Sequence, residues 1–325
     1  MNNSSAPKIL ITSTSFGKKV QEPLEVLQSK GYDLKPNDLG RPMTPEELME
    51  RLADCDGCIA GLDYFTADVI GAAPNLKIIA RYGAGIDRVD LDAAAEAGVT
   101  VTNTPVANSD SVADLAIGLM LAVARKIPTA DRSVRAGQWE NMYGVSLFEK
   151  TVGLVGYGRI GSRVAARAKG FSCRVIVHDP FIDAAAAEKD GVELAALEDV
   201  LSQSDFISLH LPANDETRGS FNAERFAQMK PTAILVNTAR GEVVDQEALL
   251  EALEEGQIGG AGLDAHSQEP PDPKPYEAFD NVVLTPHMGA YTREALVNMA
   301  MGSVENLCAF FEGRQPPNVV ARPKR

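Results

Sequence analysis

The chain has few of the residues and segments that mark secreted or membrane proteins. Only 4 of its 325 residues are cysteine, too few for a disulfide framework and in keeping with a reducing compartment. The longest apolar stretch, residues 115–124, has about half of the ~20 residues that a bilayer span requires, and Gly118 interrupts it. Residues 1–12 lack the basic and apolar regions of a secretory signal. We therefore expect a cytoplasmic protein that is not embedded in a membrane.

Positive charge is also scarce. The chain has 31 Lys and Arg against 45 Asp and Glu, a formal net charge of −14. Because an acidic surface repels phosphate backbones and anionic lipid, neither nucleic acid nor a membrane is an expected partner. Hydrophobic residues make up 45% of the chain, which excludes disorder and, at this length, suits two globular domains with separate cores.

Short β-branched runs alternate with helical segments along both halves of the chain. This alternation is typical of parallel sheets covered by helices. The runs of the second half are numerous enough for a doubly wound nucleotide-binding sheet. We therefore predict an α/β protein with two doubly wound parallel-sheet lobes. The runs lie at 8–12, 57–61, 77–80 and 99–103 in the first half, and at 151–156, 173–179, 206–212, 233–237, 261–265 and 281–287 in the second.

Two long apolar helices are expected on either side of the second sheet, at about 109–125 and 292–312. They look like crossing elements between two lobes. The chain would then begin in one lobe, build the second lobe whole and return to the first. The prediction is a discontinuous domain, residues 1–103 and 293–325, with a second domain inserted at 104–292.

A glycine-rich turn follows the first strand of the inserted domain and opens a helix. Gly156 allows the tight turn, Gly158 lets backbone approach a diphosphate, and Gly161 permits close packing of helix on strand. The next strand ends in Asp179, near the spacing expected of the acid that binds both ribose hydroxyls. Its charge would repel a 2′-phosphate, and residues 180–182 offer no cation, so the pattern predicts NAD and not NADP. The alternative is an ordinary strand-end aspartate beside a structural glycine turn.

Three ionisable residues follow the ends of neighbouring predicted strands. Arg240 ends one strand, His287 lies just past another, and Glu269 lies in a proline-rich loop between them. In open α/β sheets ligands bind at this edge. Hydride transfer to or from a carbinol carbon needs a proton carrier and a cation for the substrate's carboxylate. We expect His287 to be the acid/base, Glu269 to orient the ring and favour its protonated form, and Arg240 to clamp the carboxylate and carbonyl oxygens.

With these residues in place, the sequence resembles the D-isomer-specific 2-hydroxyacid dehydrogenases. Within that family it is similar to the short phosphoglycerate-dehydrogenase-like members that lack a C-terminal regulatory domain. The resemblance spans nearly the whole chain. It is carried by residues 81–90, 103–121, 152–165, 209–212, 236–253, 262–270 and 284–290.

The resemblance implies a Rossmann NAD-binding domain inserted in a flavodoxin-like substrate domain. It assigns the catalytic positions to Arg240, Glu269 and His287, and it has the Ala84 and Gly85 backbone amides bind the substrate carboxylate. It also implies a homodimer that forms through residues 128–150, which include Trp139. The residues expected to line the dinucleotide are Gly156, Tyr157, Gly158, Arg159, Ile160, Gly161, Asp179, Leu211, Pro212, Thr217, Thr238, Ala239, Asp264 and Gly289.

One departure from the family pattern bears on the substrate. Enzymes of 3-phosphoglycerate usually carry an Arg-Ser pair where this chain reads Ala-Gly-Leu-Asp at 60–63. Asp63 would meet a phosphate where a cation is expected, and Arg81 remains as one possible cation for a charged substrate tail. The expected substrate is a small 2-hydroxy or 2-keto acid. Glycerate and hydroxypyruvate, 3-phosphoglycerate, a sulfolactate-type acid and smaller alkyl acids all stay open.

The sequence also allows other roles for several cysteines and histidines, and other functions for the protein. Cys55 and Cys58 have the spacing of a zinc or redox site, but with no second pair we expect buried thiols and no metal. His178 and His210 end strands near the cofactor edge and can be ordinary structural histidines. His266 is a weaker candidate than His287 for the acid/base. The competing functions are an NAD(H)-sensing co-repressor-like protein and a phosphite-type dehydrogenase.

Overall fold

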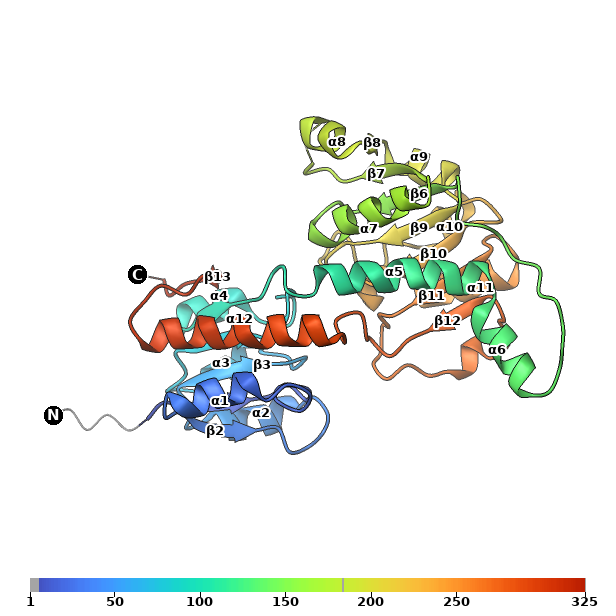
Figure 1. The fold of residues 1–325 in the computed structure, drawn as a ribbon. Coiled ribbons are helices and arrows are strands. Elements are labelled where there is room, and N and C mark those ends of the chain that lie inside the picture. Colours follow the sequence, from blue (N-terminus) through green and yellow to red (C-terminus); the bar gives the residue numbers. More distant parts are fainter. Residues whose placement is uncertain (1–5, 183, 325) are drawn as a thin grey trace. The chain divides into compact units, whose positions relative to one another are not determined.

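The structure is a computed structural model that describes residues 6–182 and 184–324. Its chain divides into two compact units. The first comprises the chain up to Asn108 and again from Tyr291 onward, and the second is Ser109–Ala290. The first unit is therefore discontinuous in sequence, and the second is a single insertion (Figure 1).

A six-stranded sheet forms the centre of the first unit. Its strands lie in the order β13-β5-β4-β3-β1-β2. All neighbouring strands are parallel except β13, which is antiparallel to β5. The order β2-β1-β3-β4-β5 is that of flavodoxin, which confirms the expected fold of this unit. The strands are β1 (Lys8–Ile11), β2 (Asp33–Pro36), β3 (Gly57–Ala60), β4 (Ile78–Arg81), β5 (Thr100–Thr102) and β13 (Val319–Ala321).

Helices cover both faces of this sheet. One face packs against α1 and α12 through Leu27, Val304 and Leu307, and the other packs against α2, α3 and α4 through Leu48, Val69 and Ala94. The alternation of side chains along each strand sends successive apolar residues to opposite faces. The helices are α1 (Glu22–Ser29), α2 (Pro45–Leu52), α3 (Ala67–Gly71), α4 (Leu91–Glu96) and α12 (Arg293–Phe311).

A seven-stranded parallel sheet forms the centre of the second unit. Its order is β12-β11-β10-β9-β6-β7-β8, so the direction of winding reverses between β6 and β9. This is the doubly wound arrangement of nucleotide-binding sheets, extended by one strand, and it confirms the predicted fold. The strands are β6 (Thr151–Val155), β7 (Arg174–His178), β8 (Glu193–Leu194), β9 (Phe206–Leu209), β10 (Ile234–Asn237), β11 (Gly260–Leu263) and β12 (Val282–Leu284).

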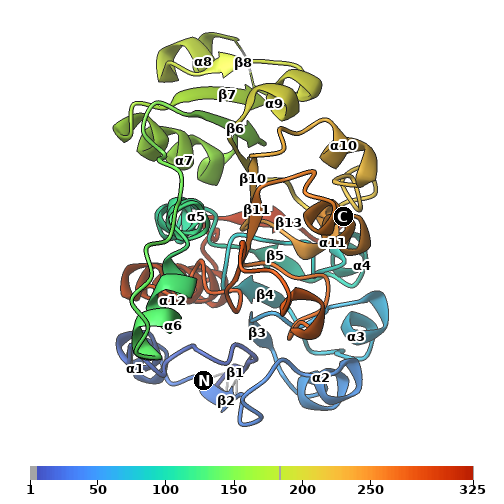
Figure 2. The same ribbon diagram turned by 90° about the vertical axis from the view of Figure 1, so that its right-hand side faces the viewer.

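Both faces of the second sheet are covered as well (Figure 2). α5 and α7 bury Met120 and Val164 on one face, and α9, α10 and α11 bury Leu201, Phe226 and Leu249 on the other. The helices are α5 (Ser109–Ala124), α6 (Ile127–Arg135), α7 (Arg159–Gly170), α8 (Ala184–Asp190), α9 (Leu197–Gln203), α10 (Ala223–Ala227) and α11 (Gln246–Glu254), with 3₁₀ turns η1 (Gly241–Val243) and η2 (Lys274–Tyr276). Among the described residues, no helix has both the length and the apolar character to cross a membrane.

The division between the units lies a few residues from the predicted boundaries. Residues 104–108 group with the first unit, not the second. The reason is local, because Thr104 is tied to Gly83 twice, through its backbone amide (3.0 Å) and its hydroxyl (3.1 Å). The second unit therefore starts at the first residue of α5.

Candidate active site

The three predicted catalytic residues lie on loops that follow three adjacent strands of the second unit. Arg240 follows β10, Glu269 follows β11 and His287 follows β12. β10, β11 and β12 are hydrogen-bonded neighbours and run parallel. Their carboxyl ends therefore meet at one edge of the sheet, where ligands bind in folds of this class.

His287 and Glu269 are in direct contact. Nδ1 of His287 lies 2.5 Å from Oε1 of Glu269. Their side chains are 28% and 24% exposed, so both remain accessible to a small molecule. Since a carboxylate only accepts hydrogen bonds, this contact places a proton on Nδ1 and leaves Nε2 as the nitrogen for proton exchange.

The loop of His287 is held by a buried carboxylate. Asp264 is 2% exposed, and it accepts hydrogen bonds from the Thr285 hydroxyl (2.6 Å) and from the backbone amides of Met288 and Gly289 (2.8 Å each). His287 itself has a φ of +50°, a left-handed conformation that is uncommon for a residue with a side chain. The bonds to Asp264 on both sides of His287 keep it in this conformation.

The loop of Arg240 is fixed in a similar way by Asn237. This asparagine is 1% exposed; its side-chain nitrogen donates to the Arg240 carbonyl (2.8 Å), and its side-chain oxygen accepts from the Ala239 amide (3.0 Å). Gly241, the residue after Arg240, packs on the backbone of His266, since a Cβ at Gly241 would lie 1.9 Å from the His266 carbonyl carbon. The loops of Arg240 and Glu269 are thus in contact.

The glycine-rich turn has the geometry that a diphosphate requires. Gly156 has a φ of +96°, and a Cβ at Gly161 would lie 2.4 Å from the Gly156 carbonyl oxygen, while one at Gly158 would meet open space. α7 begins after Gly158 with no side-chain hydrogen bond at its N-cap. Its first amides are therefore available to an anion, as in other nucleotide-binding turns.

Asp179 lies at the same turn. Its carboxylate accepts hydrogen bonds from the backbone amides of Tyr157 (2.6 Å) and Phe181 (2.8 Å). Each carboxylate oxygen keeps a lone pair for a further donor, such as a ribose hydroxyl. The residues present therefore fit the diphosphate and ribose of a dinucleotide.

Other residues expected to line the dinucleotide follow β9 and β10, while Asp264 and Gly289 follow β11 and β12. Thr217 donates from its hydroxyl to the Pro212 carbonyl (2.6 Å), which closes the loop that follows Leu211. Thr238 and Ala239 are buried at the end of β10. Within the described structure the Thr238 hydroxyl oxygen is buried and has no hydrogen-bond partner, so a ligand group can still satisfy it.

Comparison with known proteins identifies the family. Residues 117–289 match the family described as D-isomer specific 2-hydroxyacid dehydrogenase, NAD binding domain. The chain belongs to the D-isomer specific 2-hydroxyacid dehydrogenase family. It is therefore an NAD-binding oxidoreductase of this family, as the motifs predicted.

Relatives cover nearly the whole chain of this dehydrogenase. A glyoxylate reductase from Korarchaeum cryptofilum is 44% identical over 287 residues, 86% of each chain. A D-3-phosphoglycerate dehydrogenase from Methanocaldococcus jannaschii is 41% identical over 97% of this chain but only 60% of its own length. The solved structure of TT0316 protein from Thermus thermophilus has a TM-score of 0.88 and 40% identity, and the match covers 97% of this chain and all of that one.

Arg81, Ala84 and Gly85 of the dehydrogenase belong to the first unit, and there the structure changes one expectation. Arg81 is 4% exposed, and its guanidinium donates to the carbonyls of Gly85 and Ala60 (3.0 Å each). This placement favours a role in holding the loop of Ala84 and Gly85 over direct contact with a substrate tail.

The expectation that Asp63 faces an anionic tail is wrong. Asp63 is 1% exposed and accepts hydrogen bonds from the Thr12 hydroxyl and from the Met43 amide. The side chains on either side of it, Leu62 and Tyr64, are 38% and 50% exposed. The two exposed side chains are neutral, and the Arg88 guanidinium lies 4.9 Å from the Tyr64 ring centroid. Asp63 is turned inward, where its hydrogen bonds hold it.

The other histidines differ in their surroundings. His178 lies near the Ala195 carbonyl, and His266 bonds to the loop of His287. The ring nitrogens of His210 are buried without a partner in the described structure, and burial lowers the pKa of His210 to about 4. His210 packs beneath the glycine turn, since a Cβ at Gly156 would lie 2.5 Å from its carbonyl oxygen.

The cysteines behave as packing residues. Cys55 and Cys58 are fully buried in the core of the first unit. Burial raises the pKa of the Cys55 thiol to about 11 and the pKa of Cys58 well above its usual value. Across residues 6–182 and 184–324, no group of three or more His, Cys, Asp or Glu side chains is arranged to hold a metal ion.

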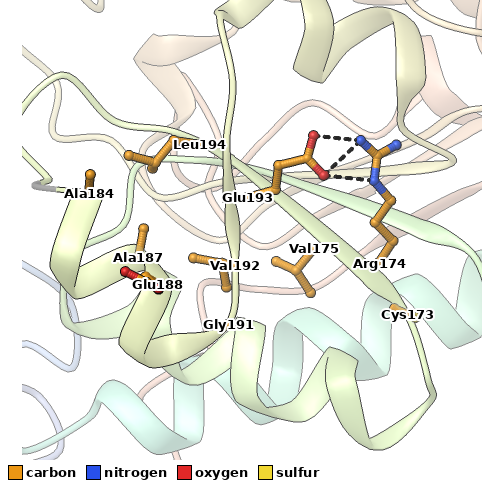
Figure 3. Close-up of a pocket in the computed structure, with 10 residues that line it drawn as sticks. All are labelled: Cys173, Arg174, Val175, Ala184, Ala187, Glu188, Gly191, Val192, Glu193 and Leu194. Atoms are coloured by element: carbon orange, nitrogen blue, oxygen red, sulfur yellow. Dashed lines mark hydrogen bonds and ion pairs between the residues drawn. The ribbon is translucent and has the colours of Figure 1, made fainter.

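A surface pocket of the second unit lies apart from these residues (Figure 3). It is lined by Cys173 and Arg174, at the start of β7, and by residues of α8 and β8. Arg174 forms a bidentate ion pair with Glu193 at this pocket. Since Asp179 follows the opposite end of β7, this pocket is not the dinucleotide site.

Sequence reasoning missed the residues that hold the site together. Asn237 and Thr285 were not singled out. Asp264 was predicted to line the dinucleotide, and the bonds of its carboxylate to the loop of His287 were not foreseen. Their shared feature is visible in the sequence, since each is a polar residue at or just past the end of an apolar strand. That feature alone does not say which loop each side chain will bond.

Proposed function

We propose that the protein interconverts a small D-2-hydroxy acid and its 2-keto acid with NAD(H), with His287 as the acid/base. The observation that carries the proposal is the 2.5 Å contact of His287 Nδ1 with Glu269 Oε1. The loop of Glu269 also packs against the loop of Arg240, through His266 and Gly241. A proton carrier and a guanidinium at one sheet edge are what this reaction needs.

The chemistry assigns one task to each side chain. When bound, NADH supplies the hydride that adds to the keto carbon of the substrate. His287 gives the proton on Nε2 to the carbonyl oxygen as that oxygen gains charge, and takes a proton back from the hydroxyl in the reverse direction. Glu269 holds the ring by Nδ1, and Arg240 binds the carboxylate and carbonyl oxygens through its planar fork.

We propose further that the substrate lacks a second anionic group. In the first unit, the charges of Asp63 and Arg81 are buried and bonded within the protein, whereas Leu62 and Tyr64 are exposed. The glyoxylate reductases from Korarchaeum cryptofilum and Aeropyrum pernix match this chain over 86% and 96% of their own lengths, whereas the D-3-phosphoglycerate dehydrogenase from Methanocaldococcus jannaschii matches over 60% of its length. Both observations favour glyoxylate or hydroxypyruvate over phosphohydroxypyruvate or sulfopyruvate.

NAD is the proposed cofactor in preference to NADP. Asp179 is anchored at the turn by two backbone amides, so its charge stays where a 2′-phosphate would approach. The neighbouring Phe181 is uncharged and 93% exposed. The Asp179 carboxylate would repel the 2′-phosphate of NADP, and uncharged Phe181 offers no cation to bind that phosphate, which supports the choice of NAD.

We also propose a homodimer through α6 and the segment that follows it. Large apolar side chains are exposed there, with Trp139 88% and Tyr143 90% exposed. An exposed apolar group of this kind marks an association surface. Sedimentation of the wild type and of a Trp139→Ser, Tyr143→Ser variant tests the idea, and a wild type that sediments as a monomer would contradict it.

The function is tested by NADH oxidation with a panel of 2-keto acids. Glyoxylate, hydroxypyruvate, pyruvate, phosphohydroxypyruvate and sulfopyruvate are compared at equal concentration, each with NADH and with NADPH. We expect turnover with NADH and the highest kcat/KM for glyoxylate or hydroxypyruvate. Turnover with none of the acids would refute the enzymatic proposal, and a preference for phosphohydroxypyruvate would refute the proposed substrate class.

A further inference from the structure

His266 lies where the three loops of the proposed site meet. It belongs to the loop that runs from β11 to Glu269, and it is 8% exposed. Its ring nitrogen Nε2 lies 2.9 Å from the carbonyl oxygen of Thr285, in the loop of His287. Because a carbonyl oxygen only accepts, Nε2 of His266 carries the hydrogen and donates it.

The same carbonyl oxygen is bonded to His287. The backbone amide of His287 donates to the Thr285 oxygen at 3.0 Å. This bond spans two residues, and it accompanies the left-handed backbone of His287, whose φ is +50°. The His266 ring therefore reaches an oxygen atom that is bonded directly to the backbone of His287 and that belongs to the loop held by Asp264.

The third loop rests on the backbone of His266. A Cβ at Gly241 would come within 1.9 Å of the His266 carbonyl carbon and 2.2 Å of its oxygen, so only glycine allows this approach. Gly241 directly follows Arg240. A shift of His266 therefore displaces the Arg240 loop as well as the loop of His287.

We propose that His266 is a positioning residue, which sets the place of the His287 imidazole through the Thr285 carbonyl and does not itself exchange protons with the substrate. The bond occupies Nε2 of a residue that is only 8% exposed, whereas the side chain of His287 is 28% exposed and its Nε2 is not the nitrogen bonded to Glu269. Glu269 then follows His266 on the same loop, so the bond from His266 to Thr285 joins the loop of Glu269 to the loop of His287. This inference rests on the proposed function of that pair.

The experiment distinguishes the effect of the N–H donor of His266 from the effect of the volume of its side chain. His266→Gln keeps an N–H near the position of Nε2, whereas His266→Phe keeps a ring and removes the donor. We expect kcat for reduction of the best keto acid to stay within about two-fold of wild type in the glutamine variant. In the phenylalanine variant we expect kcat to fall about five-fold, as loss of one hydrogen bond allows, with KM for NADH unchanged and a larger solvent isotope effect on kcat.

Ser267→Ala is the matched control, since Ser267 lies on the same loop but bonds to Gln246 (2.9 Å) instead of to the loop of His287. Its kcat and solvent isotope effect should equal those of wild type. If His266→Phe behaves like this control, or if its loss is confined to NADH binding, the inference is wrong. If the phenylalanine variant does not fold, His266→Asn, whose amide is too short to reach, should show the same loss.

The proposed function is checked separately with His287→Gln. A large loss of kcat in that variant, together with a His266→Phe variant of wild-type kcat, would overturn the inference about His266 alone. Full turnover of His287→Gln would overturn the role of His287, and the role of His266 with it.

Discussion

The two units are built alike, but they place charge differently at the carboxyl ends of their strands. In the second unit, His287 and Glu269 are bonded to each other and partly exposed, and buried polar groups such as Asp264 and Asn237 hold the loops around them. In the first unit, Asp63 and Arg81 are buried and bonded within the protein, and the residues exposed beside Asp63, Leu62 and Tyr64, contact Arg88.

The comparison shows that a charged residue at a sheet edge is not by itself a reactive group. Asp264 and Asp63 are almost equally buried, and both use their oxygens to fix a loop. What distinguishes the second unit is that two ionisable side chains on its fixed loops, His287 and Glu269, are paired with each other at 2.5 Å. The following variants test this difference, in order of decreasing expected effect.

His287→Gln should have the largest effect. Removal of the acid/base is expected to lower kcat by about 10²- to 10⁴-fold with nearly unchanged affinity for NADH. Steady-state kinetics and NADH fluorescence titration measure the two quantities. A variant that turns over as fast as wild type would remove the main difference between the units.

Arg240→Ala should come next. Loss of the charged fork is expected to lower kcat/KM for the keto acid about 10²-fold or more, because the substrate carboxylate loses its bidentate partner. Arg240→Lys, which keeps the charge without the fork, is the control and should recover part of the loss. Unaltered kcat/KM in both variants would rule out the clamp.

Asp63→Asn should affect stability and not chemistry. The amide replaces an oxygen that accepts a buried hydrogen bond, so we expect a loss of about 1–3 kcal/mol in the free energy of unfolding. Asp68→Asn, an exposed neighbour on α3, should change it by about 0.5 kcal/mol or less. Urea unfolding and kcat are the measurements, and a stable but inactive Asp63→Asn variant would show that the first unit also carries a reactive charge.

Asp179→Ala should have the smallest effect. Without the charge at the glycine turn, the preference for NADH over NADPH is expected to fall about ten-fold, as one lost charge interaction of about 1.4 kcal/mol allows. The ratio of kcat/KM for the two cofactors measures this preference. A wild type that already prefers NADPH would contradict the argument from the ribose.

Much of the fold was predictable because the strands of parallel sheets are buried and leave an apolar pattern. The six strands expected in the second half are all present. β2 and β8 were missed, since β2 is an edge strand that reads Asp-Leu-Lys-Pro and β8 is only two residues long. β13 was missed because it is three residues long and lies antiparallel at the edge of the first sheet.

The charged residues of the candidate site were predictable from the sequence, but the hydrogen bonds that hold their loops were not. Arg240, Glu269 and His287 were found because each follows a strand and carries a charge suited to the reaction. Asp63 was expected to meet, and so disfavour, a phosphorylated substrate, yet it turns inward to bond a backbone amide. Asp264 was predicted to line the dinucleotide, and the bonds of its carboxylate to the loop of His287 were not foreseen. Hydrogen bonds between distant residues depend on which loops become neighbours, and no local pattern gives that.

The amino-acid sequence by itself determined the two-lobed α/β architecture, the glycine turn with its acid, and the choice of chemically competent side chains. These follow from local periodicity and from the chemistry of single residues. Only the tertiary structure decided which charges face outward and which are used inside. The pairing of His287 with Glu269, the inward turn of Asp63, and the contact of His266 with Thr285 each join residues that only folding brings together.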